Sequence, residues 1–224
     1  MIEEAYLSKL AGELAALEVS SAFNMRVKSR FDRAMSGLAI ICLAPFLIVL
    51  ALLVRMTGRS VIYAQERVGK NGELFKCYKF RTMYPDAENR LKQLLSSNAE
   101  LKSEWDTHFK LKNDPRITPI GRFLRKTSLD ELPQLWNIWR GDMSVVGPRP
   151  VVVDELYLYG AKASRYISVK PGLTGLWQVS GRNDLTYDER VKLDADYVDN
   201  LSFALDCKII LKTFAVMVTQ KGAY

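Results

Sequence analysis

The length of 224 residues and a hydrophobic content of 48% allow one sizeable domain with a core. The net charge of +7 predicts anionic partners, and lipid headgroups, nucleotide phosphates and nucleic acid all qualify. An odd number of cysteines without metal-ligand spacing argues against a disulfide framework and indicates a reducing compartment; they are Cys42, Cys77 and Cys207. The lone histidine, His108, argues against a histidine-based metal site and against Ser-His catalysis.

The first predicted element is an amphipathic helix over residues 2–18, in which leucines recur at helical spacing. We assign residues 1–25 to this part of the chain. Residues 26–60 form the next part, because residues 34–54 carry no charge over 21 positions. That is the length which a helix needs to cross a membrane.

Pro45 lies near the middle of this apolar run and changes what the run can do. A proline removes one helical hydrogen bond and kinks the helix, so each arm reaches only about half of a hydrocarbon core of roughly 30 Å. Basic residues on both sides favour a hairpin with both ends on the cytoplasmic face; they are Arg26, Lys28, Arg30 and Arg33 before the run and Arg55, Arg59 and Arg67 after it. The residues alone leave a re-entrant and a spanning helix equally open.

Residues 61–224 are predicted to form one compact domain of the α+β class that is mostly helical. Its elements are a small β-hairpin over 61–82, one or two charged helices over 86–110, and helices over 186–199 and 203–219. Lysines interrupt the apolar residues of the last helix. This pattern suits an amphipathic helix lying on a membrane interface as well as it suits an ordinary core helix.

Two adjacent carboxylates, Asp130 and Glu131, mark the most informative stretch of the chain. Ser128 and Glu131 have the spacing of a capping box. We prefer Asp130 near the N-cap, because Pro133 then falls inside the first helical turn. In either register Asp130 lies at a helix N-terminus, where the helix dipole favours its ionised form. Cations surround the pair in sequence, which predicts an anion site containing a nucleophile; they are Arg122, Arg125, Lys126 and Arg149.

Two further segments carry basic residues beside aromatic or glycine residues. Phe75–Met83 includes Lys79 and Arg81, and Lys170–Arg182 is rich in glycine and ends in an arginine. Taken alone, the first is typical of a hairpin edge protected by charge, and the second of an ordinary turn. Each segment by itself therefore predicts no function.

Together with Thr127–Pro150, these two segments resemble the bacterial polyprenyl-phosphate phosphoglycosyl transferases, and the resemblance runs from Arg30 to the C-terminus. It implies a monotopic enzyme whose membrane helix is kinked at Pro45 and re-entrant. It also implies that the catalytic domain lies on the cytoplasmic face of the bacterial inner membrane. Anionic membrane lipids are then expected partners, and nucleic acid is not.

The resemblance also implies the reaction. Such an enzyme transfers a sugar-1-phosphate from a UDP-sugar to undecaprenyl phosphate and releases UMP, through a phosphosugar bound covalently to Asp130. The C-terminal segments resemble the galactose- or glucose-1-phosphate branch that primes exopolysaccharide or O-antigen synthesis. The implied cofactor is Mg²⁺, with Glu131 and Asp130 as ligands, and Glu131 is alternatively a base that assists the lipid phosphate. The implied phosphate-binding residues are Lys79, Arg81, Arg125, Arg149 and Arg182. The oligomeric state stays open, a homodimer included.

Two alternatives belong to other functional classes. Asp194-Ala195-Asp196 matches the Asp-x-Asp pattern of metal-dependent glycosyltransferases, which release UDP. Its context predicts a helix, on which residues two apart point about 200° away from each other and cannot hold one metal ion together. The other alternative is a non-catalytic, basic, membrane-anchored binding protein, which would tolerate the loss of Asp130.

Overall fold

The computed structural model describes residues 5–7, 9–10, 25–58, 60–108, 111 and 114–219. The chain forms two compact units. The first comprises Met1–Leu43, Ala64–Tyr78 and Pro133–Ala223, and the second Ala44–Tyr63, Lys79–Leu132 and Tyr224. The boundary passes through the membrane-type helix and through the hairpin, so both elements contribute residues to both units.

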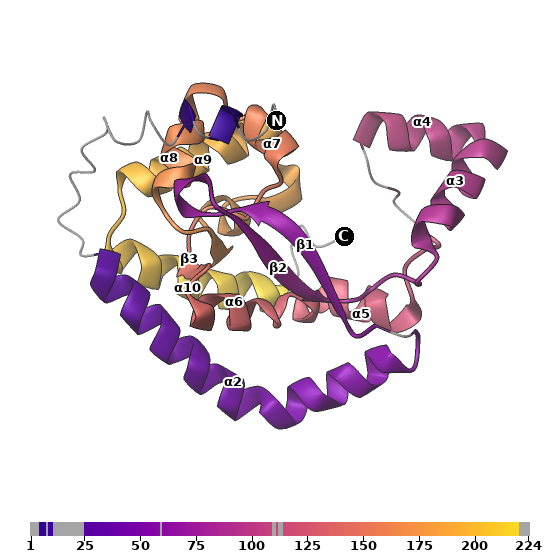
Figure 1. Ribbon diagram of the computed structural model, residues 1–224, viewed down its shortest axis with the longest axis horizontal. Helices are drawn as coiled ribbons and strands as arrows, with labels where there is room; N and C mark the ends of the chain where they lie inside the picture. The colour runs from indigo at the N-terminus through magenta and orange to yellow at the C-terminus, as the bar shows by residue number, and fades with distance from the viewer. Residues whose placement is uncertain are drawn as a thin grey trace. The chain divides into compact units, whose positions relative to one another are not determined.

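Helices dominate the fold, and the mostly helical α+β class predicted from the sequence is confirmed (Figure 1). The helices are α2 (Met25–Arg55), α3 (Ala87–Ser97), α4 (Ala99–His108), α5 (Pro119–Thr127), α6 (Gln134–Arg140), α7 (Val153–Tyr157), α8 (Ala163–Ser168), α9 (Tyr187–Asp199) and α10 (Phe203–Thr219). The strands are β1 (Ile62–Val68), β2 (Leu74–Phe80), β3 (Ser144–Val146) and β4 (Gly172–Thr174). Of the helix predicted over 2–18, the structure describes residues 5–7 and 9–10, which are helical.

Helix α2 is longer than its uncharged run and continues through Pro45. Because proline has no N–H, the carbonyl of Ile41 lacks its usual helical partner. Among the described helices, α2 is long and apolar enough to cross a membrane. Its apolar side chains are largely exposed, and they include Phe31, Leu38, Ile41, Ile48 and Leu52. A water-soluble helix would bury such a face, so these side chains need an apolar environment. The re-entrant path of the helix stays a prediction.

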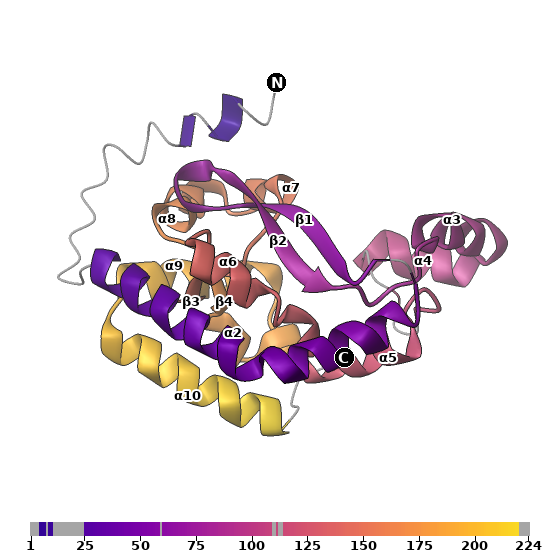
Figure 2. The same ribbon diagram turned by 60° about the horizontal axis from the view of Figure 1, so that its bottom comes forward.

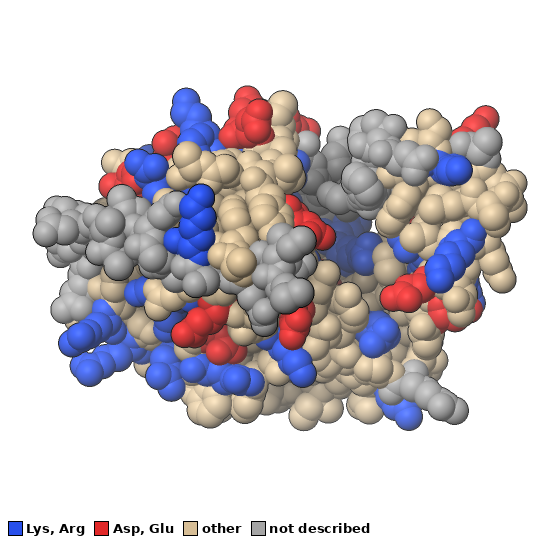
Figure 3. All heavy atoms as spheres, turned by 45° about the horizontal axis from the view of Figure 1, so that its top comes forward, with Lys and Arg blue, Asp and Glu red and all other residues tan. Residues whose placement is uncertain are grey.

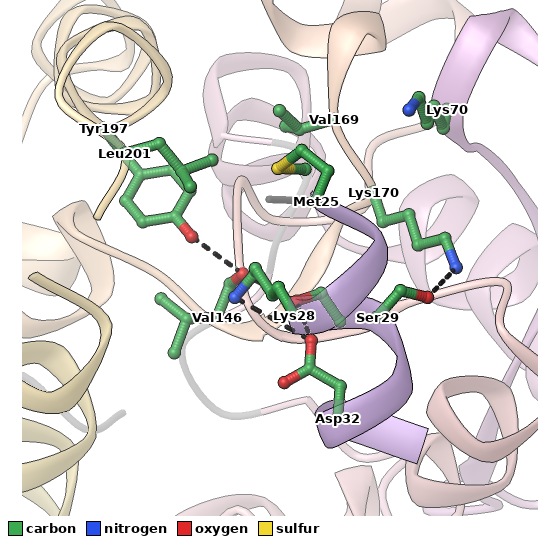
Figure 4. A pocket seen from close by; sticks show the side chains of 11 residues that line it. Met25, Lys28, Ser29, Asp32, Lys70, Val146, Val169, Lys170, Tyr197 and Leu201 are labelled. Carbon is green, nitrogen blue, oxygen red and sulfur yellow. Dashed lines mark hydrogen bonds and ion pairs between the residues drawn. The ribbon is translucent and has the colours of Figure 1, made fainter. Parts of the chain in front are cut away.

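The beginning of α2 is tied to the first unit by buried charges, here called the α2 anchor cluster: Lys28, Asp32 and Asp206. Lys28 Nζ lies 2.5 Å from Asp206 Oδ2 and 3.8 Å from Asp32 Oδ2. Asp206 also accepts the Tyr197 hydroxyl at 2.7 Å, and Asp32 accepts the Ser144 hydroxyl. Figure 4 shows Lys28, Asp32 and Tyr197 around a small cavity that they help to line. Both carboxylates of this cluster therefore have a lysine and a hydroxyl group as partners.

A short parallel pair, β3 and β4, forms the middle of the first unit and was not expected from the sequence. Ser144 pairs with Gly172, and Val146 with Thr174. A side chain at Gly172 would meet the backbone nitrogen of Gly147 at 2.1 Å, so only glycine allows this approach. Helix α10 packs against the pair (Figure 2). The glycines of the Lys170–Arg182 segment therefore have a packing role.

The second unit has its own apolar core. Leu50 and Val54 of α2 pack there against Phe80 and Leu124, and further residues of the cluster include Leu129 and Leu132. These last two leucines flank Asp130 and Glu131 in sequence. The core thus holds the backbone of the acidic pair from both sides.

Candidate active site

The acidic pair lies in a short connection between α5 and α6. Ser128 adopts a left-handed conformation with φ of 57°, and its N–H donates to the Arg125 carbonyl, which ends α5. A single 3-10 turn, Leu129–Glu131, follows, and Pro133 directly precedes α6. The predicted capping box and the predicted N-cap position of Asp130 are therefore wrong. Ser128 terminates one helix instead of starting the next, because the neighbouring leucines are held in the apolar core.

Burial governs the charge of Asp130. It raises the pKa of this carboxyl from 3.8 to about 6, and the negative charge of Glu131 acts in the same direction. The positive charges of Lys79 and Arg125, together with the Asp130 backbone N–H, oppose this increase. The predicted stabilisation of the carboxylate by a helix N-terminus is thus outweighed. Near neutral pH the group still carries its charge for most of the time.

The three cations predicted in the second unit have different partners. Lys79 at the end of β2 donates to Glu131 Oε1 at 2.6 Å, and both side chains are partly exposed. Arg125 donates its Nε–H to the hydroxyl of Thr82 at 2.9 Å. Arg81 lies over the ring of Tyr63 at 5.7 Å, and its buried Nε has no hydrogen-bond partner within the described parts of the chain. The second unit thus brings Lys79 and Arg125 into the electrostatic environment of the acidic pair.

Arg149 and Arg182 belong to the first unit. Arg149 lies in a loop that is held by two backbone hydrogen bonds to the segment 172–174. Burial raises the pKa of Asp194 to about 7, and the charge of Arg149 acts against that increase. Arg182 is half-buried and has a positive φ of 52°, at the start of the 3-10 turn Arg182–Asp184. Both arginines are partly exposed.

The Asp-x-Asp pattern lies on α9, as the sequence predicts. Asp194 is buried and accepts the Tyr159 hydroxyl at 2.8 Å, whereas Asp196 is half-buried, two residues further along the helix. Asp194 therefore has a packing role inside the first unit. This arrangement does not support a metal site shared by the two aspartates.

Sequence reasoning missed two polar residues that contact candidate site segments. Thr82 contacts Arg125, and only its place directly after Arg81 in a basic segment could have drawn attention to it. Asn137 on α6 is fully buried and bridges to β2, accepting from the Tyr78 N–H at 3.0 Å and donating to the Lys76 carbonyl at 2.7 Å. The sequence signal for Asn137 was a polar residue next to tryptophans.

The remaining polar chemistry is limited. Cys42, Cys77 and Cys207 are all free. Within the described ranges, no group of three or more His, Cys, Asp or Glu residues could hold a metal ion. Figure 3 shows both signs of charge over one face, with basic side chains gathered along its lower left border. The side chain of His108 lies outside the described residues.

Comparisons with known proteins give the family. Undecaprenyl-phosphate galactose phosphotransferase of Salmonella typhimurium is 50% identical over 198 residues, which cover 88% of this chain and 42% of that protein. Exopolysaccharide production protein ExoY of Sinorhizobium fredii is 50% identical over 198 residues, 88% of either chain. Undecaprenyl-phosphate glucose phosphotransferase of Komagataeibacter xylinus is 37% identical over 216 residues, 91% of this chain and 38% of that protein.

The chain thus spans 42% of the length of several curated relatives and most of the length of others. The family described as bacterial sugar transferase matches residues 23–220, which include every candidate site residue named above. From this match and these identities, the chain belongs to the bacterial sugar transferase family.

Proposed function

We propose that this protein transfers a hexose-1-phosphate from a UDP-sugar to undecaprenyl phosphate, releasing UMP, with Asp130 as the nucleophile. The observation that carries the proposal is the partly buried Asp130–Glu131 pair with Lys79 and Arg125 acting on it, in a chain of the bacterial sugar transferase family. Both substrates are polyanions, so an attacking carboxylate needs fixed positive charge close by.

In the first step, an Asp130 carboxylate oxygen attacks the β-phosphorus of the UDP-sugar. A bond forms between that oxygen and phosphorus, and the bond from phosphorus to the bridging oxygen of UMP breaks. The bridging oxygen takes the electron pair, so UMP leaves as an anion. Lys79 is held at 2.6 Å from Glu131, and together with Arg125 it supplies the positive charge that lowers the repulsion between carboxylate and phosphates.

In the second step, a phosphate oxygen of undecaprenyl phosphate attacks the same phosphorus. The new bond forms the sugar-diphosphate lipid, and the bond to Asp130 breaks and restores the carboxylate. Retention of the phosphosugar between the steps requires that water stays out. The apolar cluster behind the pair, which includes Leu129 and Leu132, contributes to that exclusion.

We propose that the carboxylates of Asp130 and Glu131 hold a magnesium ion. Mg²⁺ usually takes one or two protein carboxylates and completes its six oxygen ligands with water and substrate phosphates. The repulsion between the two acids, which contributes to the raised pKa of Asp130, would be relieved by a divalent cation. Bound there, the ion would neutralise charge on the donor phosphates. Lys79 would then share Glu131 with the metal.

The sugar and the location follow from the relatives and from α2. Proteins named for galactose and for glucose transfer are both among the relatives, and those named for galactose are the more similar, at 50% against 37% identity. We therefore favour galactose-1-phosphate. The exposed apolar side chains of α2 support association with a membrane. We propose that this is the inner membrane, with the catalytic residues on its cytoplasmic face.

The experiment uses UDP-galactose carrying a labelled β-phosphate, with the full chain in nanodiscs. Without lipid acceptor, label should remain on a peptide containing Asp130, and UMP should appear in equal amount. Asp130→Asn should form no labelled enzyme, and Asp196→Asn should form as much as the wild type. Full turnover by wild-type enzyme that never carries label would contradict the covalent step. Release of UDP would instead support the Asp-x-Asp alternative.

A further inference from the structure

The backbone of Thr82 is fixed against the first turn of α5. Its carbonyl accepts the Thr118 N–H at 3.0 Å and the Thr118 hydroxyl at 3.3 Å. A side chain at Gly121 would meet the Thr82 carbonyl oxygen at 2.1 Å, so the two backbones are in close contact. Thr82 itself is 6% exposed. The backbone position of Thr82 is therefore fixed relative to α5.

That side chain reaches the last turn of α5. The Thr82 hydroxyl oxygen accepts the Nε–H of Arg125 at 2.9 Å. Asp114 is the nearby carboxylate that could compete for Arg125, but Arg116 binds it with Nε and Nη2 at 2.7 to 3.0 Å. In the described parts of the chain, the two terminal nitrogens of Arg125 make no hydrogen bond. Thr82 thus restrains Arg125 through Nε alone.

When a guanidinium is held at Nε, its terminal N–H groups are left to donate to a second group. This fork matches two oxygens of a phosphate, and the match depends on the orientation of the plane. The charged groups that act on Arg125 are Asp130, Asp114 and Arg116, and Asp130 is the only one at the proposed reaction centre. An oriented Arg125 thus offers directional donors in addition to the positive charge that acts on Asp130.

We infer that Thr82 is a positioning residue, which orients the guanidinium of Arg125 so that its terminal N–H groups receive the phosphoryl group transferred to Asp130. This inference rests on the proposed function for the identity of the anion. A donor placed before the reaction stabilises the transition state more than the ground state. Thr82 should therefore affect the rate of the covalent step more than the affinity for the UDP-sugar.

The test replaces Thr82 by valine, which has the same shape without the hydroxyl, and by serine, which restores it. Thr82→Val should slow the single-turnover formation of labelled enzyme about tenfold, with the Kd for UDP-galactose changed by less than about threefold. Thr82→Ser should stay within about threefold of the wild type. In an Arg125→Ala background, Thr82→Val should add nothing. A serine variant as slow as valine, or a full additional loss in the double variant, would overturn the inference.

Thr118→Val is the matched control, because it also removes a buried hydroxyl from the contact between this segment and α5. Thr118 accepts the Gly121 N–H at 2.9 Å as the N-cap of α5, so the change should cost stability without the selective loss of rate. A Thr118→Val enzyme as slow as Thr82→Val would show that any damage to α5 has this effect, and would overturn the positioning role.

The Nε–H resonance of Arg125 separates the inference from the proposed function. Assigned by Arg125→Lys, this signal should exchange slowly with water in the wild type and in Thr82→Ser, and it should be lost or exchange fast in Thr82→Val. Equal signals in all three proteins would refute the contact itself. If no UDP-sugar labels the wild type, the proposed function fails, and the resonance still decides whether Thr82 orients Arg125.

Discussion

Two groups of one lysine and two carboxylates occur in this protein, and they differ in how their charges are compensated. In the α2 anchor cluster, Lys28 contacts both Asp32 and Asp206, and hydroxyl groups donate to each of these carboxylates. In the acidic pair, Lys79 forms an ion pair with Glu131. No side chain in the described ranges donates a hydrogen bond to Asp130. The first group is closed, and the second leaves one carboxylate available.

The difference separates a structural role from a chemical one. Buried charges stabilise a fold only when their hydrogen bonds are complete, and the α2 anchor cluster meets that condition. A nucleophile needs the opposite, since an oxygen with all its lone pairs engaged cannot attack. Burial raises the pKa of Asp130 to about 6, and burial also raises the pKa of Asp206 in the α2 anchor cluster, so the two groups differ in their hydrogen bonds and not in the direction of this shift. The same residue types thus hold a helix in one place and, in the proposed function, carry the reaction in the other.

The largest expected effect on stability comes from removing the lysine of the α2 anchor cluster. Lys28→Met leaves two buried carboxylates without their cation, which should cost about 3–5 kcal/mol of unfolding free energy. Lys79→Met breaks a partly exposed pair and should cost less than about 1 kcal/mol. Thermal unfolding of both variants in nanodiscs measures the contrast. Equal losses would show that the two lysines do not differ in this way.

Asp130→Asn should stabilise the protein while it abolishes labelling. The pKa of Asp130 is about 6 when folded and near 3.8 when unfolded, so the ionised group opposes folding above pH 6. The amide removes that cost, a gain of about 1–3 kcal/mol at pH 7.5. The gain should shrink as the pH falls from 6 to 4, and vanish below, where the acid is neutral in both states.

Denaturant unfolding of Asp130→Asn against the wild type at several pH values, with EDTA to remove divalent cations, gives this difference directly. Asp142→Asn is the control, since Asp142 is engaged by Arg140 and by Asn137. A loss of stability in Asp130→Asn at pH 7.5 would mean that Asp130 is compensated after all.

The pH dependence of the covalent step follows from the same group. Attack requires the ionised carboxylate, so kcat/KM for UMP release should fall about tenfold per pH unit below about pH 6. Lys79→Met removes a positive charge that lowers the pKa of Asp130, so the fall in kcat/KM should begin at a higher pH. A profile that is flat down to pH 5 would show that the free enzyme holds Asp130 at a lower pKa.

Regular elements were predictable because their signals are local. The helix predicted over 186–199 is α9, which begins at Tyr187 behind a capping box of Thr186 and Glu189. The hairpin predicted over 61–82 is formed by β1 and β2. The polar contacts that connect distant parts of the chain are not local. Lys28 and Asp206 are 178 residues apart, and Thr82 and Arg125 are 43 apart. No spacing rule covers such pairs, since packing alone brings them together.

The acidic pair shows the same limit at short range. Residue types identified Asp130 and Glu131 as candidates. The prediction of their local structure was wrong, because Ser128 ends α5 in a left-handed conformation. Serine has little preference for that conformation, and the apolar core that holds Leu129 and Leu132 imposes it. The parallel β3–β4 pair was missed for a related reason: three residues are too few to show a period.

The smallest expected effect is on activity, and it concerns helix α2. Helix α2 carries Lys28 and Asp32 near its beginning and passes into the unit of the acidic pair between Leu43 and Ala44, next to Pro45. Pro45→Leu restores a backbone hydrogen bond and leaves 21 uncharged residues that can span a bilayer. We expect part of the population to change from a re-entrant to a spanning path, and activity to fall severalfold.

Cysteine labelling from each side of the membrane measures this change, in a background with Cys42, Cys77 and Cys207 replaced. Val27 and Ser60 are exposed on either side of the apolar run, and a cysteine at either position should react only from the cytoplasmic side when the helix is re-entrant. In Pro45→Leu, the two positions should begin to react from opposite sides. Phe46→Leu is the control, because it changes an exposed apolar side chain and leaves the backbone hydrogen bonds as they are. Opposite-side labelling in the wild type would refute the re-entrant path. The α2 anchor cluster would then fix the first turns of a spanning helix, and Pro45 would have no part in keeping its two ends on one face.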